Sequence, residues 1–122
     1  MGLDMYALTM TGAPSSQVDF IPDEAVERIH YWRKHPNLHG WMEQLYRDKG
    51  GTDDSFNQVS VQLTAGDLDD LELAIKVNVL PETAGFFFGA SDGSETEDDL
   101  GFIAKAREAQ AAGKTVFYTS WW

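Results

Sequence analysis

The stretch HYWRKHPNLHGW, residues 30–41, gathers three histidines, and imidazole is the side chain best suited to proton transfer and metal ligation near neutral pH. His35 and His39 are four residues apart, and Glu43 follows after four more. On an unbroken helix these three side chains would share one side and could ligate zinc or another divalent metal. Pro36 interrupts such a helix and leaves His35 at or before its cap.

A structural role for these histidines is favoured, because structural zinc normally takes four protein ligands, the chain has no cysteine, and no HExxH arrangement is present. We expect His35 to cap a helix and His39 to hydrogen-bond a backbone carbonyl where two helices meet. Trp32 and Trp41 are expected in the core. A Ser-His-Asp set can also be drawn, but no nucleophile elbow such as GxSxG marks it. No catalytic residue, metal ligand or cofactor is therefore assigned, and a metal-dependent enzyme using His35, His39 and Glu43 is the alternative.

Acidic side chains are concentrated between residues 50 and 104, which hold twelve acidic residues and one basic residue, Lys76. The densest run, SDGSETEDD at 91–99, is no EF-hand, because its sixth position lacks the required glycine. Its structural interpretation is a solvated helix start with Ser94 and Glu97 as a capping box. The functional interpretation is an anionic surface for a basic partner, formed by Asp92, Glu95, Glu97, Asp98, Asp99, Asp67, Asp69 and Asp70.

The composition limits the classes of function. A net charge of -11 repels phosphate backbones, so direct nucleic-acid binding is not expected. Without cysteine the chain has no disulfide, thiolate metal site or cysteine nucleophile, which suits a reducing compartment. We see no signal-peptide run and no apolar stretch of membrane-spanning length, and therefore expect a cytoplasmic protein with no membrane contact.

The elements that would position these residues follow from hydrophobic periodicity and turn signals. Helical spacing predicts helices over 22–34, from Pro36 to Gly50, from Thr64 through Ile75, and from the acidic run to Gly113. Alternation and short apolar runs predict strands at 1–10, 56–63, 85–89 and 114–122. We therefore expect one α+β domain over residues 1–122, with a partly antiparallel sheet of about four strands and about four helices packed on it.

Four motifs in the same order, MGLDMY, YWRK followed by LHGW, FFFG, and FYTSWW, resemble a family of small phage and bacterial proteins with no established activity. The resemblance implies a phage or mobile-element origin and a cytosolic setting. Members of that family sometimes carry a phosphoglycerate kinase label, which does not fit this chain, because that enzyme has two nucleotide-binding lobes and is several times longer. The AGKT at 112–115 lacks the first P-loop glycine and lies between a helix and a strand, the reverse of the P-loop order.

The sequence thus favours a small acidic, non-enzymatic binding protein that engages a basic protein surface, for example by inhibiting a host nucleic-acid-handling or defence protein. A further alternative is a structural or virion-assembly component that self-associates through its C-terminal strand. Trp121 and Trp122 are adjacent there and must face opposite ways, so at most one of them can enter the core.

Overall fold

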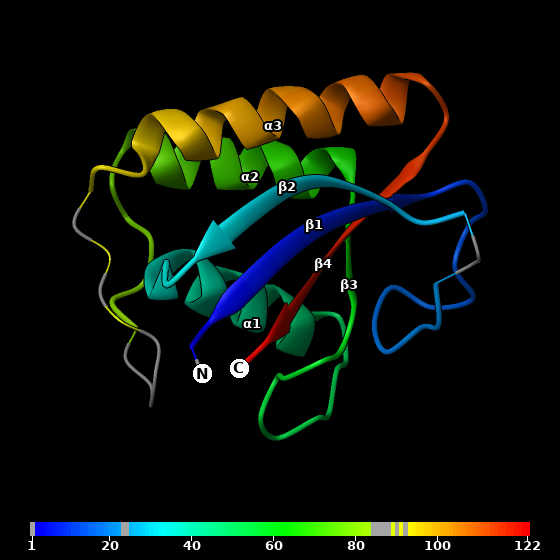
Figure 1. Cartoon of the computed structure of the whole chain (residues 1–122), viewed down its shortest axis with the longest axis horizontal. Helices are drawn as coiled ribbons and strands as arrows, with labels where there is room; N and C mark the ends of the chain where they lie inside the picture. The colour runs from blue at the N-terminus through cyan, green and yellow to red at the C-terminus, as the bar shows by residue number, and fades with distance from the viewer. Residues whose placement is uncertain (1, 23–24, 84–88, 90, 92) are drawn as a thin grey trace.

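A computed structural model of the protein describes residues 2–22, 25–83, 89, 91 and 93–122. Within them the chain forms four strands and three helices, which Figure 1 labels. Their order is β1 (Asp4–Met10), β2 (Glu27–Arg33), α1 (Pro36–Asp48), β3 (Val61–Leu63), α2 (Ala65–Lys76), α3 (Thr96–Ala111) and β4 (Thr115–Trp121).

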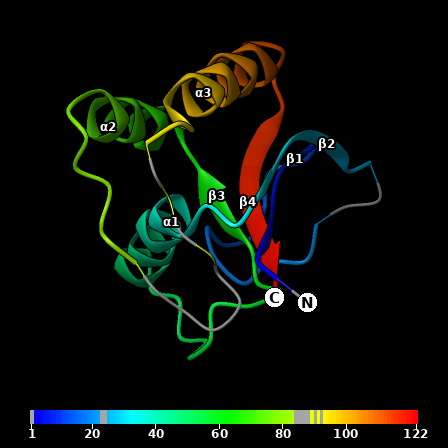
Figure 2. The same ribbon diagram turned by 60° about the vertical axis from the view of Figure 1, so that its left-hand side comes forward.

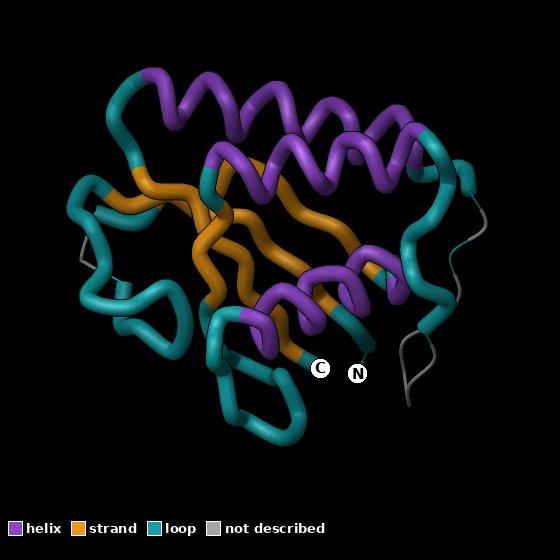
Figure 3. The backbone as a smooth tube through the Cα atoms, turned by 180° about the vertical axis from the view of Figure 1, so that it is seen from behind, coloured by secondary structure: helices purple, strands orange, loops and turns teal. Residues whose placement is uncertain are grey.

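The four strands form one sheet in the order β2-β1-β4-β3, in which every neighbouring pair is antiparallel. β1 and β4 occupy its centre and pair along their whole length, from Asp4 opposite Trp121 to Met10 opposite Thr115. Figure 3 shows the molecule from the side opposite to that of Figure 1. In this view all three helices lie nearer the viewer than the strands, so the helices cover one face of the sheet. The α+β class and the number of strands are confirmed, the sheet predicted to be partly antiparallel is antiparallel in every pair, and the described residues form three helices where about four were predicted.

The predicted helix over 22–34 is wrong, because residues 27–33 form strand β2 at the edge of the sheet. A bulge explains the error. Ala7 pairs with His30 and Leu8 with Arg28, so Ile29 is an extra residue in β2. Ile29 therefore packs against the core together with Trp32, three positions later. Because of the bulge, inward apolar residues of this strand are three positions apart, which is also the spacing on one face of a helix.

The other predicted helices are confirmed with small changes in their ends. α2 begins with the predicted capping box, in which Thr64 and Asp67 each bond the other's backbone N–H. Gly50 and Gly113, which follow α1 and α3, have φ values of 98° and 84°, a conformation that favours glycine at a helix end. The predicted capping box of Ser94 and Glu97 is wrong: the N-cap of α3 is Glu95, and among the described residues no side chain makes the capping hydrogen bond.

Two strand predictions need qualification. β3 comprises only the last three residues of the predicted strand 56–63, and positive φ values at Phe56 and Gln58 interrupt the extended backbone before it. The predicted strand at 85–89 lies outside the described residues, except for Gly89. β4 agrees closely with the predicted C-terminal strand.

The main core lies between the sheet and the helices, where inward side chains such as Met5, Ala7 and Tyr118 meet Leu38, Leu68 and Phe102. Trp32 is buried there as expected, and Trp41 packs against the same cluster while partly exposed. A second, smaller cluster lies on the opposite face of the sheet and comprises Met10, Phe20 and Phe117, with Leu8 beside it. No helix in the described ranges is long and apolar enough to cross a membrane.

Candidate functional site

The three side chains of the metal hypothesis take three different environments. His35 bonds Ser91 and Asp99, His39 bonds Tyr118, and Glu43 accepts a hydrogen bond from Arg47. In the part of the chain that the structure describes, no group of three histidine or acidic residues is placed to hold a metal ion. The four-residue spacing therefore does not bring His35, His39 and Glu43 to one site.

His39 is buried beneath the sheet, where one of its ring nitrogens bonds a side-chain hydroxyl. Its Nδ1 lies 2.6 Å from the Tyr118 hydroxyl, and its ring packs beside Phe56 at a centroid distance of 5.0 Å. Burial lowers the pKa of His39 to about 4, because the apolar surroundings disfavour the charged imidazole. Burial likewise raises the pKa of Tyr118 well above its ordinary value. His39 is thus a neutral core residue near pH 7.

His35 is the N-cap residue of α1, but its imidazole bonds distant side chains instead of the helix. Nε2 lies 2.8 Å from Asp99 Oδ2, and Nδ1 lies 2.6 Å from Ser91 Oγ. Ser91 in turn accepts a hydrogen bond of 3.1 Å from the backbone N–H of Asn37, so a serine from a distant loop satisfies the first turn of α1.

Asp99 links this network to the sheet. Its side chain is 2% exposed, and Oδ1 accepts a 3.0 Å hydrogen bond from the indole N–H of Trp32 while Oδ2 faces His35. The carboxylate therefore meets one donor from β2 and one from the start of α1. Asp99 was predicted as a partner-binding residue, but its burial leaves no carboxylate surface for a partner to contact.

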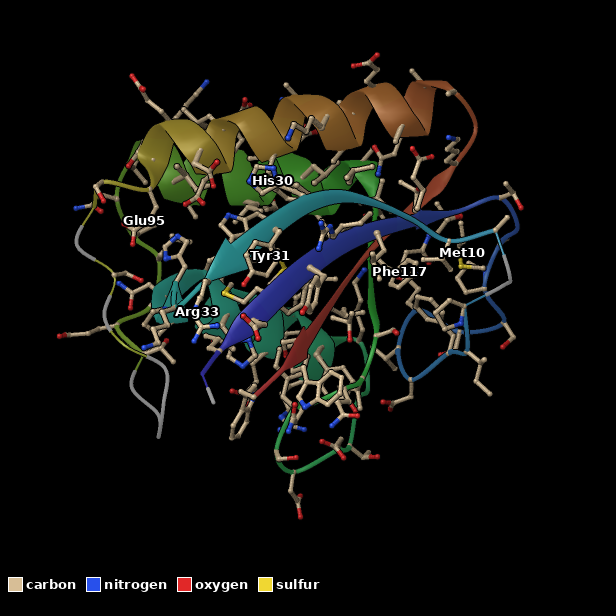
Figure 4. The ribbon with its side chains drawn as sticks, in the orientation of Figure 1. Met10, His30, Tyr31, Arg33, Glu95 and Phe117 are labelled. Atoms are coloured by element: carbon tan, nitrogen blue, oxygen red, sulfur yellow. The ribbon has the colours of Figure 1, made fainter. Side chains whose placement is uncertain are left out.

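Asp98, the neighbour of Asp99, binds a second histidine. Its Oδ2 lies 2.9 Å from His30 Nε2, and Lys105 Nζ lies 3.1 Å from the Nδ1 of the same ring. The His30 side chain is 7% exposed and packs against Trp32 with the two rings tilted by 56°, whereas Asp98 is 57% exposed. Figure 4 shows His30 on β2 where this strand passes α3.

The remaining predicted partner-binding residues are divided between the two ends of the helical layer. α2 and α3 run antiparallel side by side in Figures 1 and 3, so their acidic first turns point to opposite ends of the molecule.

The individual carboxylates also differ in their surroundings. Asp67 pairs with Lys49, and Asp69 pairs with Arg107 at 2.7 Å. Asp70 and Glu97 are exposed, Glu95 lies 3.6 Å from His35, and Asp92 lies outside the described residues. The structure therefore does not gather these eight carboxylates on one end.

Arg107 shows how the antiparallel helices neutralise one acidic start. From the second half of α3 it reaches α2, where Nη2 contacts Asp69 and Nη1 contacts Glu72 at 3.0 Å. The hydrogen bond from Arg107 lowers the pKa of Glu72. Because Asp69 is exposed and Arg107 and Glu72 are partly exposed, the attraction is screened by water and salt.

An apolar strip that the sequence analysis did not identify lies at the far end of α2. Leu73, Val77 and Val79 are 62%, 54% and 62% exposed. The same end of α2 lies close to the start of α3, since Ile75 and Asn78 line one small recess with Glu95 and Thr96. In Figure 2 these two helix ends are neighbours. The end of α2 that carries the exposed aliphatic side chains is thus close to the acidic first turn of α3.

The face of the sheet away from the helices is open near its left end in Figure 4, where Tyr31 and Arg33 are labelled. Asp4 accepts hydrogen bonds there from the Tyr31 hydroxyl at 2.6 Å and from Arg33 at 3.0 Å, and the former bond raises the pKa of Tyr31. Beside them, Trp121 is 63% exposed and, together with Tyr6, lines a hollow of about 330 Å³. Trp122 packs against the main core, so the prediction that the two tryptophans face opposite ways is confirmed.

The sequence analysis missed the role of Ser91, because 56 residues separate it from His35 and no local motif marks their contact. It missed the apolar strip because the i, i+4 pair of Leu73 and Val77 resembles the buried spacing of any amphipathic helix. Comparison of the chain with models of protein families, with curated proteins and with solved structures found no match.

Proposed function

We propose that the protein acts by binding another protein, and that the contact surface is the face of the helical layer formed by α2 and α3. This docking face comprises the exposed aliphatic strip Leu73, Val77 and Val79, the exposed Asp70 three residues before Leu73 on the same helix, and the exposed Glu97 in the first turn of the neighbouring α3. The observation that carries the proposal is the exposure of the strip, which is 54–62% for its three side chains. A contiguous exposed apolar patch with a polar rim is typical of protein-binding sites.

Charge supports a basic amphipathic segment as the partner. The net charge is -11, and α2 and α3 begin with acidic turns. A partner helix with aliphatic residues on one side and lysine or arginine beside them would match both the strip and its rim. Long-range attraction would increase the association rate and make binding sensitive to salt. A host nucleic-acid-handling or defence protein, the class to which the family resemblance pointed, has basic surfaces of this kind.

The proposal can be tested with tagged protein, lysate of the host cell and three matched variants. L73S/V77S removes the apolar strip, D70K reverses one charge beside it, and D54K makes the same charge change on the exposed Asp54, which follows α1 and lies away from the docking face. We expect a basic protein to be retained by wild type and D54K, lost by L73S/V77S, and weakened by D70K at low salt. Equal retention by all four proteins would contradict the proposal.

Self-association is a second candidate, favoured by the exposure of Trp121 beside the 330 Å³ hollow. Pairing through the edge of β4 would have to displace a neighbour, because β1 occupies one edge, and on the other β3 pairs with residues 116–118 while Asn57 and Gln58 bond the backbone of Trp122 and Ser120. The contact would therefore use the Trp121 side chain. Sedimentation equilibrium of wild type and W121S should show a concentration-dependent dimer only for wild type; a monomer at all concentrations would exclude this candidate.

A further inference from the structure

Ser91, His35 and Asp99 lie in the order that a serine nucleophile, a general base and an orienting carboxylate require. Ser91 Oγ is 2.6 Å from one ring nitrogen of His35, and Asp99 Oδ2 is 2.8 Å from the other. Both contacts are within the distance at which a base can take a proton from a hydroxyl and a carboxylate can hold that base in place. The proposed protein-binding function uses none of these three side chains.

A general base at His35 requires its proton on Nε2 and a lone pair on Nδ1. Asp99 accepts the indole N–H of Trp32 on Oδ1, and as a carboxylate it can accept the Nε2–H of His35 on Oδ2. In this tautomer Nδ1 accepts a hydrogen bond from the Ser91 hydroxyl, and the Glu95 carboxylate lies 3.6 Å from the same nitrogen. The backbone N–H of Asn37 donates to the same Ser91 oxygen from the first turn of α1. The hydrogen of the Ser91 hydroxyl thus points to a base, and its oxygen lies at the positive N-terminal end of α1.

Ser91 is also the member of this set that a small molecule can reach. It lines a hollow of about 630 Å³ together with Asn37, Asn78 and Leu80, a volume within the range of ligand sites. His35 and Asp99 lie behind it and are only 4% and 2% exposed. Water therefore has little access to the base and the carboxylate, whereas Ser91 is half-buried and borders the hollow.

We propose that Ser91 is a nucleophile toward carboxylic esters, with His35 as the general base and Asp99 as a positioning residue. Ser91 Oγ bonds to the ester carbonyl carbon while its proton moves to His35 Nδ1. The bond from carbon to the alcohol oxygen then breaks, and that oxygen takes the proton from Nδ1. Water next bonds to the carbonyl carbon and gives a proton to Nδ1. The bond between that carbon and Ser91 Oγ then breaks, and Oγ takes the proton from Nδ1 as the carboxylic acid leaves.

An alkyl fluorophosphonate tests the nucleophile directly, because Ser91 Oγ would displace fluoride from phosphorus and form a stable adduct. We expect intact-mass and peptide mass spectrometry to place one adduct on Ser91 of the wild-type protein. S91A should give no adduct, H35Q should slow labelling by about 100-fold or more, and S94A, at the exposed serine three residues later, should leave the rate unchanged. No adduct at Ser91, or equal rates for wild type and H35Q, would overturn the proposal.

A thiol provides a second test that does not depend on S91A folding correctly. The chain has no cysteine, so S91C introduces a single reporter whose thiolate has a distinct ultraviolet absorbance. A thiol paired with a charged imidazole is mostly thiolate at pH 7, about ten times the few per cent expected of an ordinary thiol. We expect this signal in S91C, a loss in S91C/H35Q and a decrease in S91C/D99N, with S94C as the ordinary thiol.

Circular dichroism and melting temperatures of the same variants show whether each one folds. A folded S91C protein whose thiol titrates like that of S94C would overturn the role of His35, and an unchanged thiolate signal in folded S91C/D99N would overturn the role of Asp99. Both measurements use the isolated protein and a small reagent. Their failure would therefore leave the proposed docking face unaffected, and loss of partner binding would leave the Ser91 proposal unaffected.

Discussion

The first turns of α2 and α3 are both acidic, but they use their carboxylates differently. At α2, Asp67 bonds the backbone of Thr64, three residues earlier, and completes a local cap. At α3, Asp98 and Asp99 bond His30 and His35, more than sixty residues away. The start of α2 thus has a cap made by its own sequence in addition to ion pairs with Lys49 and Arg107, whereas the carboxylates at the start of α3 bond the strand and helix that pack against it.

Acidic residues in the first turn of a helix can thus have two different roles, capping their own helix or bonding distant parts of the chain. A carboxylate at the N3 position of a helix is predictable because its partner is the adjacent backbone. The burial of Asp99 depends on the placement of Trp32 and His35, which only the folded sheet provides. Charge density therefore marked both helix starts as one candidate surface, although one of the carboxylates belongs to the core.

The largest effect is expected from Asp99→Ala at the start of α3. The change leaves the Trp32 indole N–H and the buried His35 ring without their acceptor, which should lower the free energy of unfolding by about 3–5 kcal/mol. Urea denaturation followed by tryptophan fluorescence would measure it. Glu97→Ala removes an exposed carboxylate from the same turn and should change the transition little. A loss below about 1 kcal/mol for D99A would mean that the two helix starts do not differ as described.

A pH series should give the next largest effect, through His39, whose partner is a core hydroxyl and not a carboxylate of α3. In the unfolded chain His39 binds a proton with a pKa near 6.5, and in the folded protein only near 4. The unfolded state therefore binds more protons between these values, and stability falls as the pH falls through this window, by up to about 3 kcal/mol.

The contribution of His39 is isolated by subtracting the same series for H39Q, in which glutamine does not titrate but can still bond Tyr118. We expect the difference between the two proteins to grow as the pH falls from about 6.5 to about 4. Parallel curves for wild type and H39Q would mean that His39 is protonated in the folded protein as readily as in the unfolded chain.

A smaller effect is expected from Thr64→Ala at the start of α2. Loss of a side-chain cap costs about 1 kcal/mol, because one backbone N–H of the first turn loses its acceptor. Ser94→Ala is the matched change before α3, where the predicted cap does not form, and it should cost much less. Thermal unfolding of both variants would decide; equal losses would show that Ser94 contributes to α3 as Thr64 does to α2.

The smallest effect is expected from Arg107→Gln, which removes the exposed ion pairs to Asp69 and Glu72. Amide hydrogen exchange in the first half of α2 should become slightly faster at low salt and unchanged at high salt, since screening already weakens these pairs. Lys114→Gln breaks an ion pair with Glu27, away from α2, and serves as the control. A salt-independent change in R107Q would indicate that Arg107 contributes through packing.

Local signals explain what the sequence could predict. The apolar periodicity of α1, the Thr64 and Asp67 box, Gly113 and the alternation of β4 each lie within a few residues, so their elements follow directly. β2 could not be recognised, because the bulge at Ile29 depends on pairing with β1. The contacts of Ser91 and Asp99 with His35 span 56 and 64 residues, a separation that periodicity and spacing do not address.

The pairing of β1 with β4 has a consequence for how the chain reaches its native state. These two strands form the middle of the sheet, yet their paired residues Met10 and Thr115 are separated by nearly the whole sequence. Synthesis from a ribosome releases β1 long before its partner exists, so the exposed edge of β1 must wait with its backbone groups bonded only to water or to β2. Such a high contact order slows folding and lengthens the time during which an incomplete chain is open to chaperones, proteases and aggregation.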